Sequence, residues 1–225
     1  MQIHARTEKL IGSDALEKLK TARVLVVGVG GVGGYVVEAL ARSGVGFLTI
    51  VDKDVVDESN INRQIIALSS TVGRSKTAVM KERIAEINPE IEVTALDLFV
   101  TPETVDGLKI NEHDYVVDAV DFMAAKVALV KESKAAGVPV ISAMGAGNKL
   151  DPTRIRVCDV EKTDVCPLAR AMRREARKHD LGHFKVAYSD ELPVINDRVP
   201  ASYVCVPATM GLVIAAEIIK DLIGK

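Results

Sequence analysis

Short apolar runs alternate with amphipathic stretches along the chain. Residues 22–30 (ARVLVVGVG) form a β-branched run that ends in glycine, and residues 34–44 (GYVVEALARSG) follow with helical spacing. Residues 47–54 (FLTIVDKD) predict a second strand, because parallel strands covered on both faces are nearly continuous in Val, Ile and Leu. The segment up to residue 54 therefore predicts a strand, a helix and a second, parallel strand.

The same alternation continues beyond this unit. It predicts helices over residues 76–87 and 126–136, and strands over residues 91–96, 114–121 and 138–145. Strands that alternate with helices in this way are typical of parallel sheets. We therefore expect an α/β fold with a doubly wound, Rossmann-like and mostly parallel sheet that has helices on both faces.

The alternation loosens after residue 150. The pattern predicts a strand over 154–160, a basic helix over 167–179, a strand over 183–189 and a closing helix over 208–223. A chain of 225 residues is long enough to bury one large core. We interpret residues 1–225 as a single domain, in which residues 1–150 are the nucleotide-binding core and residues 151–225 a C-terminal substrate or cap part.

A glycine cluster lies between the first predicted strand and helix. Gly28, Gly30 and Gly33 form G-x-G-x-x-G, a context in which backbone N–H groups and the helix dipole bind phosphate. Asp52 ends the second predicted strand, where an acidic residue usually takes the ribose hydroxyls. The pattern favours a nucleotide site, although a glycine turn that only lets helix and strand pack closely would look the same.

Polar residues after the second strand bear on which nucleotide is bound. Asn60, Arg63 and Gln64 occur in one short stretch, and Lys76 begins a predicted helix. A dinucleotide has a shielded pyrophosphate that the glycine turn can satisfy alone, whereas the triphosphate of ATP needs cationic groups and a metal ion. The stretch favours ATP, while ordinary solvated charges remain the alternative.

Overall charge does not indicate a polyanionic partner, because 29 Lys and Arg stand against 31 Asp and Glu. Any surface for nucleic acid must therefore be local. One dense basic stretch exists, and its charged and histidine members are Arg170, Arg173, Arg174, Arg177, Lys178, His179 and His183. The same pattern fits a helix that buries its apolar side and exposes its charges, so both interpretations stay open.

The cysteines indicate a reducing compartment. Cys158, Cys166 and Cys205 are odd in number and form no C-x-x-C pair, which argues against disulfides and a cysteine-rich zinc site. We expect a cytoplasmic protein, with no signal-peptide core and no apolar run long enough to span a membrane. Cys166 precedes Pro167 and would lie at a helix N-cap, where a reactive thiolate and a buried structural thiol are the two alternatives.

Several motifs occur together in a fixed order: Gly28–Gly33, the D-x-D of Asp52 and Asp54, "SNINRQ" at 59–64 and "VGRSK" at 72–76. In this arrangement the chain resembles the adenylating domain of the ubiquitin-activating-enzyme-like (ThiF/MoeB/HesA) superfamily. The resemblance implies a ligase-type enzyme in which a carboxylate attacks the α-phosphorus of ATP and pyrophosphate leaves.

The resemblance also implies residue roles. Lys76 and Arg63 would neutralise the leaving phosphates, and Asp121 would hold Mg²⁺, with Asp118 as the competing metal ligand. Arg6 would reach the partner's ATP in a homodimer, unless it is only a terminal charge. The residues expected to bind the nucleotide are Gly28, Gly30, Gly31, Gly33, Asp52, Asp54, Asn60, Arg63, Gln64, Lys76 and Asp121.

Longer segments, among them "RTEKLIGSDALEKLKTARVLVVGVGGVGG", "GAGNKLDPTRIRV" and "KTDVCPLA", are similar to one branch, the tRNA threonylcarbamoyladenosine dehydratases. That similarity implies that the carboxylate belongs to a modified adenosine beside the anticodon of tRNA, and that ring closure within the modification completes the reaction. Alternatives are an adenylyltransferase for a ubiquitin-like sulfur-carrier protein, with a sulfur-relay partner, and a non-catalytic NAD-binding module. The absence of C-x-x-C pairs sets the chain apart from sulfur-carrier enzymes that hold zinc.

Overall fold

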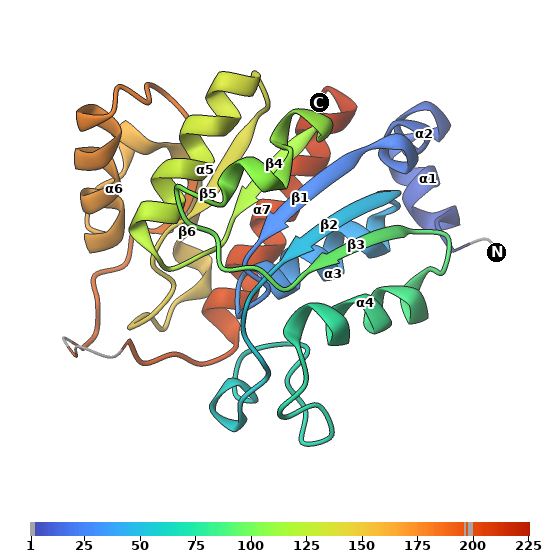
Figure 1. Ribbon diagram of the computed structural model, residues 1–225, viewed down its shortest axis with the longest axis horizontal. Helices are drawn as coiled ribbons and strands as arrows, with labels where there is room; N and C mark the ends of the chain where they lie inside the picture. The colour runs from blue at the N-terminus through green and yellow to red at the C-terminus, as the bar shows by residue number, and fades with distance from the viewer. Residues whose placement is uncertain (1–2, 196, 198–199) are drawn as a thin grey trace.

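The computed structural model describes residues 3–195, 197 and 200–225 (Figure 1). Its centre is a seven-stranded sheet with the order β3-β2-β1-β4-β5-β7-β6. All neighbouring strands are parallel except β6, which runs antiparallel to β7. The α/β, Rossmann-like fold class is thus confirmed. The strands are β1 (Arg23–Val27), β2 (Phe47–Val51), β3 (Glu92–Leu96), β4 (Tyr115–Asp118), β5 (Val140–Ala143), β6 (Ile155–Asp159) and β7 (Lys185–Ser189).

Helices cover both faces of the sheet (Figure 1). They are α1 (Ala5–Ile11), α2 (Ser13–Thr21), α3 (Gly33–Ser43), α4 (Lys76–Ile87), α5 (Met123–Ala136), α6 (Pro167–Lys178) and α7 (Cys205–Ile223). Short 3₁₀ turns are η1 (Glu58–Asn60), η2 (Val105–Leu108), η3 (Ile110–Glu112), η4 (Pro152–Arg154) and η5 (Val160–Lys162). No helix of the described residues is long and apolar enough to cross a membrane.

Two hydrophobic cores lie on opposite faces of the sheet. In β1, Val24 and Val26 belong to the core shared with α3, α4 and α7, whereas Leu25 and Val27 belong to the core shared with α5 and α6. Successive strand residues point to opposite faces, so a strand buried on both faces must be apolar at every position. This explains the uninterrupted apolar run that marks β1 in the sequence.

Helix boundaries differ from the sequence expectation at both ends of the chain. Neither of the first two helices was predicted from the sequence: α1 buries no residue and leaves no apolar stripe, and α2 was missed although it buries Ala15, Leu16 and Leu19. At the other end, α7 begins at Cys205 rather than at the expected 208, because Pro207 lies in the first turn, where a missing N–H costs nothing. Cys205 is consequently exposed on this first turn and not part of the core.

The segment between β2 and α4 leaves the sheet and returns to it. It projects below the carboxyl ends of the strands in Figure 1, and a bridge between Val55 and Ser75 closes its base. Within it, Asn62 Nδ2 donates to Ser202 O at 2.9 Å, which ties the projection to the residues before α7. Pro207 of α7 in turn packs against Gly31, 3.5 Å from where a β-carbon would lie. The projection, the glycine turn and the start of α7 thus meet at one edge of the sheet.

Candidate active site

The turn between β1 and α3 requires glycine at two positions. Gly28 has φ +93°, and a β-carbon there would lie 2.6 Å from Ala119 O. A β-carbon on Gly33 would overlap the carbonyl oxygen of Gly28. The two glycines therefore allow the turn to lie against the residues that follow β4, and they place the N-terminus of α3 at the carboxyl edge of the sheet.

Side chains from the projecting segment lie over this turn. The position of a β-carbon on Gly31 is 3.6 Å from Arg63 Cγ, and that on Gly30 is 3.8 Å from Gln64 Nε2. The helix N-terminus favours negative charge, and the guanidinium beside it adds a fixed positive charge. The sequence prediction that Arg63 and Gln64 accompany the glycine turn agrees with this placement.

Asp52 organises the turn with both of its carboxylate oxygens. Oδ2 accepts from Val29 N at 2.7 Å, and Oδ1 accepts from Asp54 N at 2.9 Å. Each oxygen has a further lone pair, so the carboxylate can still accept from a ribose hydroxyl. Asp52 thus joins the end of β2 to the glycine turn while keeping the capacity that the sequence analysis assigned to it.

Lys76 is buried at the first position of α4. Its Nζ lies 3.1 Å from Asp54 Oδ2, and its backbone N donates to Asp54 O at 3.0 Å. Ser75 caps this helix by accepting from Ala78 N at 3.3 Å. The cap fixes where α4 begins and hence where Lys76 enters the site. A buried ammonium with one carboxylate partner is suited to a further anionic ligand.

Asn60 and Arg63 also shape the projecting segment. Asn60 Oδ1 accepts from Asp57 N at 3.2 Å, which closes a capping box around η1. Arg63 Nη1 donates to Ser59 O at 2.7 Å and to Asn62 Oδ1 at 2.8 Å. Three guanidinium N–H groups of Arg63 remain available, so the contacts orient the side chain without exhausting its donors.

Gln64 carries a buried atom without a partner. The residue is 7% exposed, and its Oε1 has no hydrogen-bond partner among the described residues. A buried polar atom left unpaired costs free energy, so such an atom next to a glycine turn fits a bound ligand. The amide can present either oxygen or nitrogen, because the two ends differ only by a flip. The turn, the cationic groups and this atom together fit a nucleoside triphosphate.

Asp118 and Asp121 have different surroundings. Asp118 is fully buried, pairs with Lys126 Nζ at 3.0 Å and also accepts from Ser142 Oγ. Asp118 is therefore a structural ion-pair partner and not the alternative metal ligand. Asp121 is exposed beyond β4 and directly follows Val120, whose N lies 3.2 Å from the β-carbon position of Gly28. The described residues contain no group of three or more His, Cys, Asp or Glu that could hold a metal. A single carboxylate suits Mg²⁺, which keeps several waters and binds substrate phosphates.

Arg6 does not join these residues within one chain. It is exposed in α1, and His4 just before this helix contacts the position of a β-carbon on Gly44 at 3.7 Å. Gly44 lies between α3 and the start of β2, so α1 is at the amino ends of the strands (Figure 1). The glycine turn lies at the opposite edge.

The basic stretch around α6 is partly neutralised. Arg177 pairs with Glu161 at 2.5 Å, His183 contacts Asp159 at 3.0 Å, and Arg173 donates to Thr163 O at 2.8 Å. Arg170 and Arg174 have no ion-pair partner among the residues that the structure describes. A smaller exposed basic surface than the sequence suggested therefore remains on this helix.

Cys166 lies at the N-cap of α6, as the sequence predicted. It is 1% exposed and makes no side-chain cap hydrogen bond. A thiol buried to this extent is not accessible to a substrate, which favours the structural interpretation.

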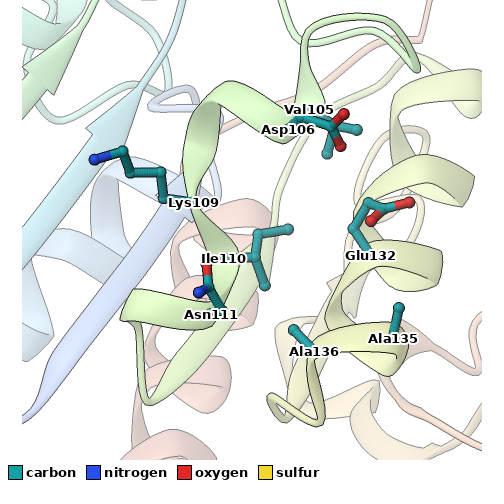
Figure 2. Close-up of a pocket in the computed structure, with 8 residues that line it drawn as sticks. All are labelled: Val105, Asp106, Lys109, Ile110, Asn111, Glu132, Ala135 and Ala136. Carbon is teal, nitrogen blue, oxygen red and sulfur yellow. The ribbon is translucent and has the colours of Figure 1, made fainter.

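A surface pocket of about 280 Å³ lies elsewhere (Figure 2). It is formed where η2 and η3 face the end of α5, with Asp106, Lys109 and Glu132 among its lining residues. These elements lead into the amino ends of β4 and β5, so the pocket is at the edge opposite the glycine turn. It is not part of the candidate active site.

The chain matches known proteins over almost its full length. It is 44% identical over 238 residues to the tRNA threonylcarbamoyladenosine dehydratase of Bacillus subtilis, a match that covers 97% of this chain and 94% of the relative. The structure of the Escherichia coli tRNA N6-threonylcarbamoyladenosine dehydratase in complex with ATP has a TM-score of 0.94 and 38% identity, and the match covers 99% of this chain and 94% of that chain.

Similarity to a second kind of relative covers less of the chain. The molybdopterin-synthase adenylyltransferase of Escherichia coli is 39% identical over 129 residues, which covers 57% of this chain and 51% of the relative. The ThiF family model matches residues 4–225. Given this match and the full-length similarity described above, the chain belongs to the ThiF family, and within it to the branch of the tRNA threonylcarbamoyladenosine dehydratases.

Proposed function

We propose that this protein is an ATP-dependent tRNA threonylcarbamoyladenosine dehydratase. The main supporting observation is that Arg63 and Gln64 lie over the glycine turn at the carboxyl edge of the sheet, while Lys76 pairs with Asp54, whose backbone N is bonded to Asp52 beside that turn. A dinucleotide has no need of two cations there, whereas a departing pyrophosphate does. The solved relative that binds ATP and the 94% coverage of the Bacillus subtilis relative support this choice.

The reaction divides into two balanced steps. First, an oxygen of the threonyl carboxylate attacks the α-phosphorus of ATP, and the bond to the leaving pyrophosphate breaks. Then a nitrogen of the same modification attacks the acyl carbon, loses its proton and closes the ring, while AMP leaves with the carboxylate oxygen. The base loses one water in total. Positioning carries much of the second step, because both groups belong to one nucleoside.

The chain's own residues would serve the first step. Lys76 and Arg63 would stabilise the charge that grows on the leaving phosphates, and Asn60 and Gln64 would orient phosphate oxygens. Asp52 would hold the ribose. We propose Asp121 as the Mg²⁺ ligand, since it is an exposed carboxylate that follows Val120, whose backbone meets the glycine turn at Gly28. Mg²⁺ would supply charge neutralisation on the phosphate oxygens.

We further propose a homodimer in which Arg6 acts on the partner's nucleotide. Helix α1 buries no residue, and Leu10 on it is 81% exposed, so the helix offers an uncovered apolar surface. Arg6 is at the edge of the sheet opposite the glycine turn of its own chain, so any role at a nucleotide would be across an interface. The tRNA would contact Arg170 and Arg174 on α6.

Residues 1–225 would act as one adenylating domain, with 1–150 binding the nucleotide and 151–225 completing the substrate side. The three free cysteines favour a reducing compartment, in line with a cytoplasmic protein. Adenylation of a ubiquitin-like sulfur-carrier protein, with a sulfur-relay partner, is the second candidate, favoured by the similarity to the molybdopterin-synthase adenylyltransferase.

One experiment separates these candidates. The protein is incubated with ATP, Mg²⁺ and total tRNA that carries threonylcarbamoyladenosine. The tRNA is then digested, and the masses of the nucleosides are measured by mass spectrometry. We expect the modified nucleoside to lose one water, with no loss in a parallel reaction that lacks ATP. An unchanged nucleoside, together with pyrophosphate exchange that depends on a sulfur-carrier protein, would instead establish the second candidate.

A further inference from the structure

A buried ion pair connects the end of β4 to α5, next to the candidate site. Lys126 of α5 and Asp118 at the end of β4 are both fully buried, with Lys126 Nζ 3.0 Å from Asp118 Oδ2. Removing two charges from water is costly, and replacing such a pair by apolar residues is often neutral or stabilising. Stability alone is therefore a weak reason for a charged pair at this position.

The side chain of Lys126 holds the backbone just before Asp121. Its Nζ donates to Val120 O at 3.0 Å, and its backbone N donates to Phe122 O at 3.1 Å. Asp118 Oδ1 in addition accepts from Val120 N at 3.3 Å. The lysine side chain thus holds the carbonyl of the peptide group just before Asp121, whereas the bond to Phe122 O is the regular first backbone bond of α5. An exposed loop residue would otherwise have a freely variable direction.

The same lysine connects this loop to its neighbours at the carboxyl edge. Lys126 Nζ also donates to Ala143 O, at the end of β5, at 2.8 Å. On the other side, Ala119 N donates to Val27 O at 2.8 Å, and Ala119 O is the atom that a β-carbon on Gly28 would meet. Lys126 therefore fixes the Asp121 loop between the glycine turn and the end of β5.

We propose that Lys126 is a positioning residue, which fixes the backbone from which Asp121 reaches the metal and the phosphates. It touches neither ligand itself. The inference rests on the proposed function, since Asp121 has a role only where a metal–nucleotide complex is bound. Partners that orient a metal ligand from behind typically change metal affinity by about 10–100-fold when they are removed.

The test replaces the pair without leaving a buried charge. In the double variant Asp118→Asn, Lys126→Met both charges are absent, and Lys131→Met makes the same change at an exposed position of α5. Circular dichroism and Tm establish folding. The readout is Mn²⁺ affinity in the presence of a non-hydrolysable ATP analogue, measured by electron paramagnetic resonance of free Mn²⁺.

We expect the folded double variant to bind Mn²⁺ about tenfold more weakly or worse, with the metal-free affinity for the analogue unchanged and Lys131→Met like the wild type. If the double variant bound Mn²⁺ with wild-type affinity, Lys126 would have only a structural role. If that variant does not fold, Lys126→Arg replaces it, because arginine keeps the charge but places its N–H donors differently. Its Mn²⁺ affinity is then compared with that of the wild type, and an unchanged affinity would refute the positioning role. Unchanged affinity in Asp121→Asn would instead refute the proposed metal role of Asp121, which distinguishes the two failures.

Discussion

Single atoms determine whether the β1–α3 turn can form. Gly33 faces the carbonyl oxygen of Gly28 so closely that any β-carbon would overlap it. We expect Gly33→Ala to lower the free energy of unfolding by about 1–3 kcal/mol, the usual cost of overpacking. In a chain of this size Tm falls by about 2–4 °C for each kcal/mol lost, which differential scanning calorimetry can measure.

The matched control is Gly107→Ala. Gly107 has no atom within 4 Å of its β-carbon position and no positive φ, so this change should leave Tm unchanged. An equal loss of stability in both variants would show that the overlap at Gly33 is relieved by local movement.

The role proposed for Lys76 is testable at the same scale. Lys76→Ala removes a buried charge that is proposed to act mainly on the departing phosphates, so we expect kcat to fall by about 10²–10³-fold. Lys81→Ala, at an exposed position of the same helix, should retain wild-type kcat. Steady-state release of AMP measures both. A Lys76→Ala variant with normal kcat and raised KM for ATP would mean that Lys76 binds the ground state and the transition state equally and does not favour the departing phosphates.

Sequence motifs predicted most residues gathered around the turn, because the glycines, Arg63 and Lys76 follow a recognisable spacing. They did not predict Lys126. A lysine in a helical pattern normally projects into solvent, and its acceptors come from three strands or loops that only the tertiary fold brings together. The motifs also did not show that Asp118 is fully buried against Lys126, an arrangement that disfavours Asp118 as the metal ligand.

At the scale of elements, the start of α4 depends on an acidic residue. Asp97 Oδ1 accepts from Thr77 Oγ1 and, at 2.7 Å, from Ser75 Oγ, the residue that caps α4. These hydroxyl donors lower the pKa of the Asp97 carboxyl below its ordinary value of 3.8. Because the pKa of Asp97 is lower in the folded state, ionised Asp97 adds to the free energy of unfolding above its ordinary pKa. This stabilisation is lost as pH falls through the folded pKa.

We therefore expect wild-type Tm to fall more steeply than that of Asp97→Asn on acidification below about pH 4. Thermal melts monitored by circular dichroism between neutral and strongly acid pH provide the comparison. Parallel curves for the two proteins would show that Asp97 adds nothing to the pH dependence. The exposed position of Asp97 keeps the expected difference small.

Elements with strong periodicity were predictable, whereas those without it were not. Helix α4 spans the predicted residues 76–87, because a capping serine and apolar spacing coincide there. Helix α1 has no buried face, and α7 starts before a proline that the pattern treats as a boundary. Helix α1 therefore offers no apolar stripe to detect, and α7 can begin before Pro207 because the first turn does not need its N–H.

For the whole molecule, the proposed homodimer predicts complementation. If Arg6 acts across a twofold interface, each site combines Lys76 of one chain with Arg6 of the other. Arg6→Ala and Lys76→Ala should each be inactive alone. Mixed and re-equilibrated, half of the dimers would be hybrids with one intact site of two, so activity should recover to about a quarter of the wild-type value. No recovery, despite exchange demonstrated by native mass spectrometry, would place Arg6 outside the partner's site.

The contact between Pro207 and Gly31 joins the first βα turn to the last helix. Because a ribosome makes the chain from its N-terminus, the turn emerges long before the helix that packs against it. A nascent chain can thus hold every glycine of the motif and still lack a finished pocket. The pocket would be complete only once the start of α7 has been synthesised, so shorter nascent chains would not consume ATP.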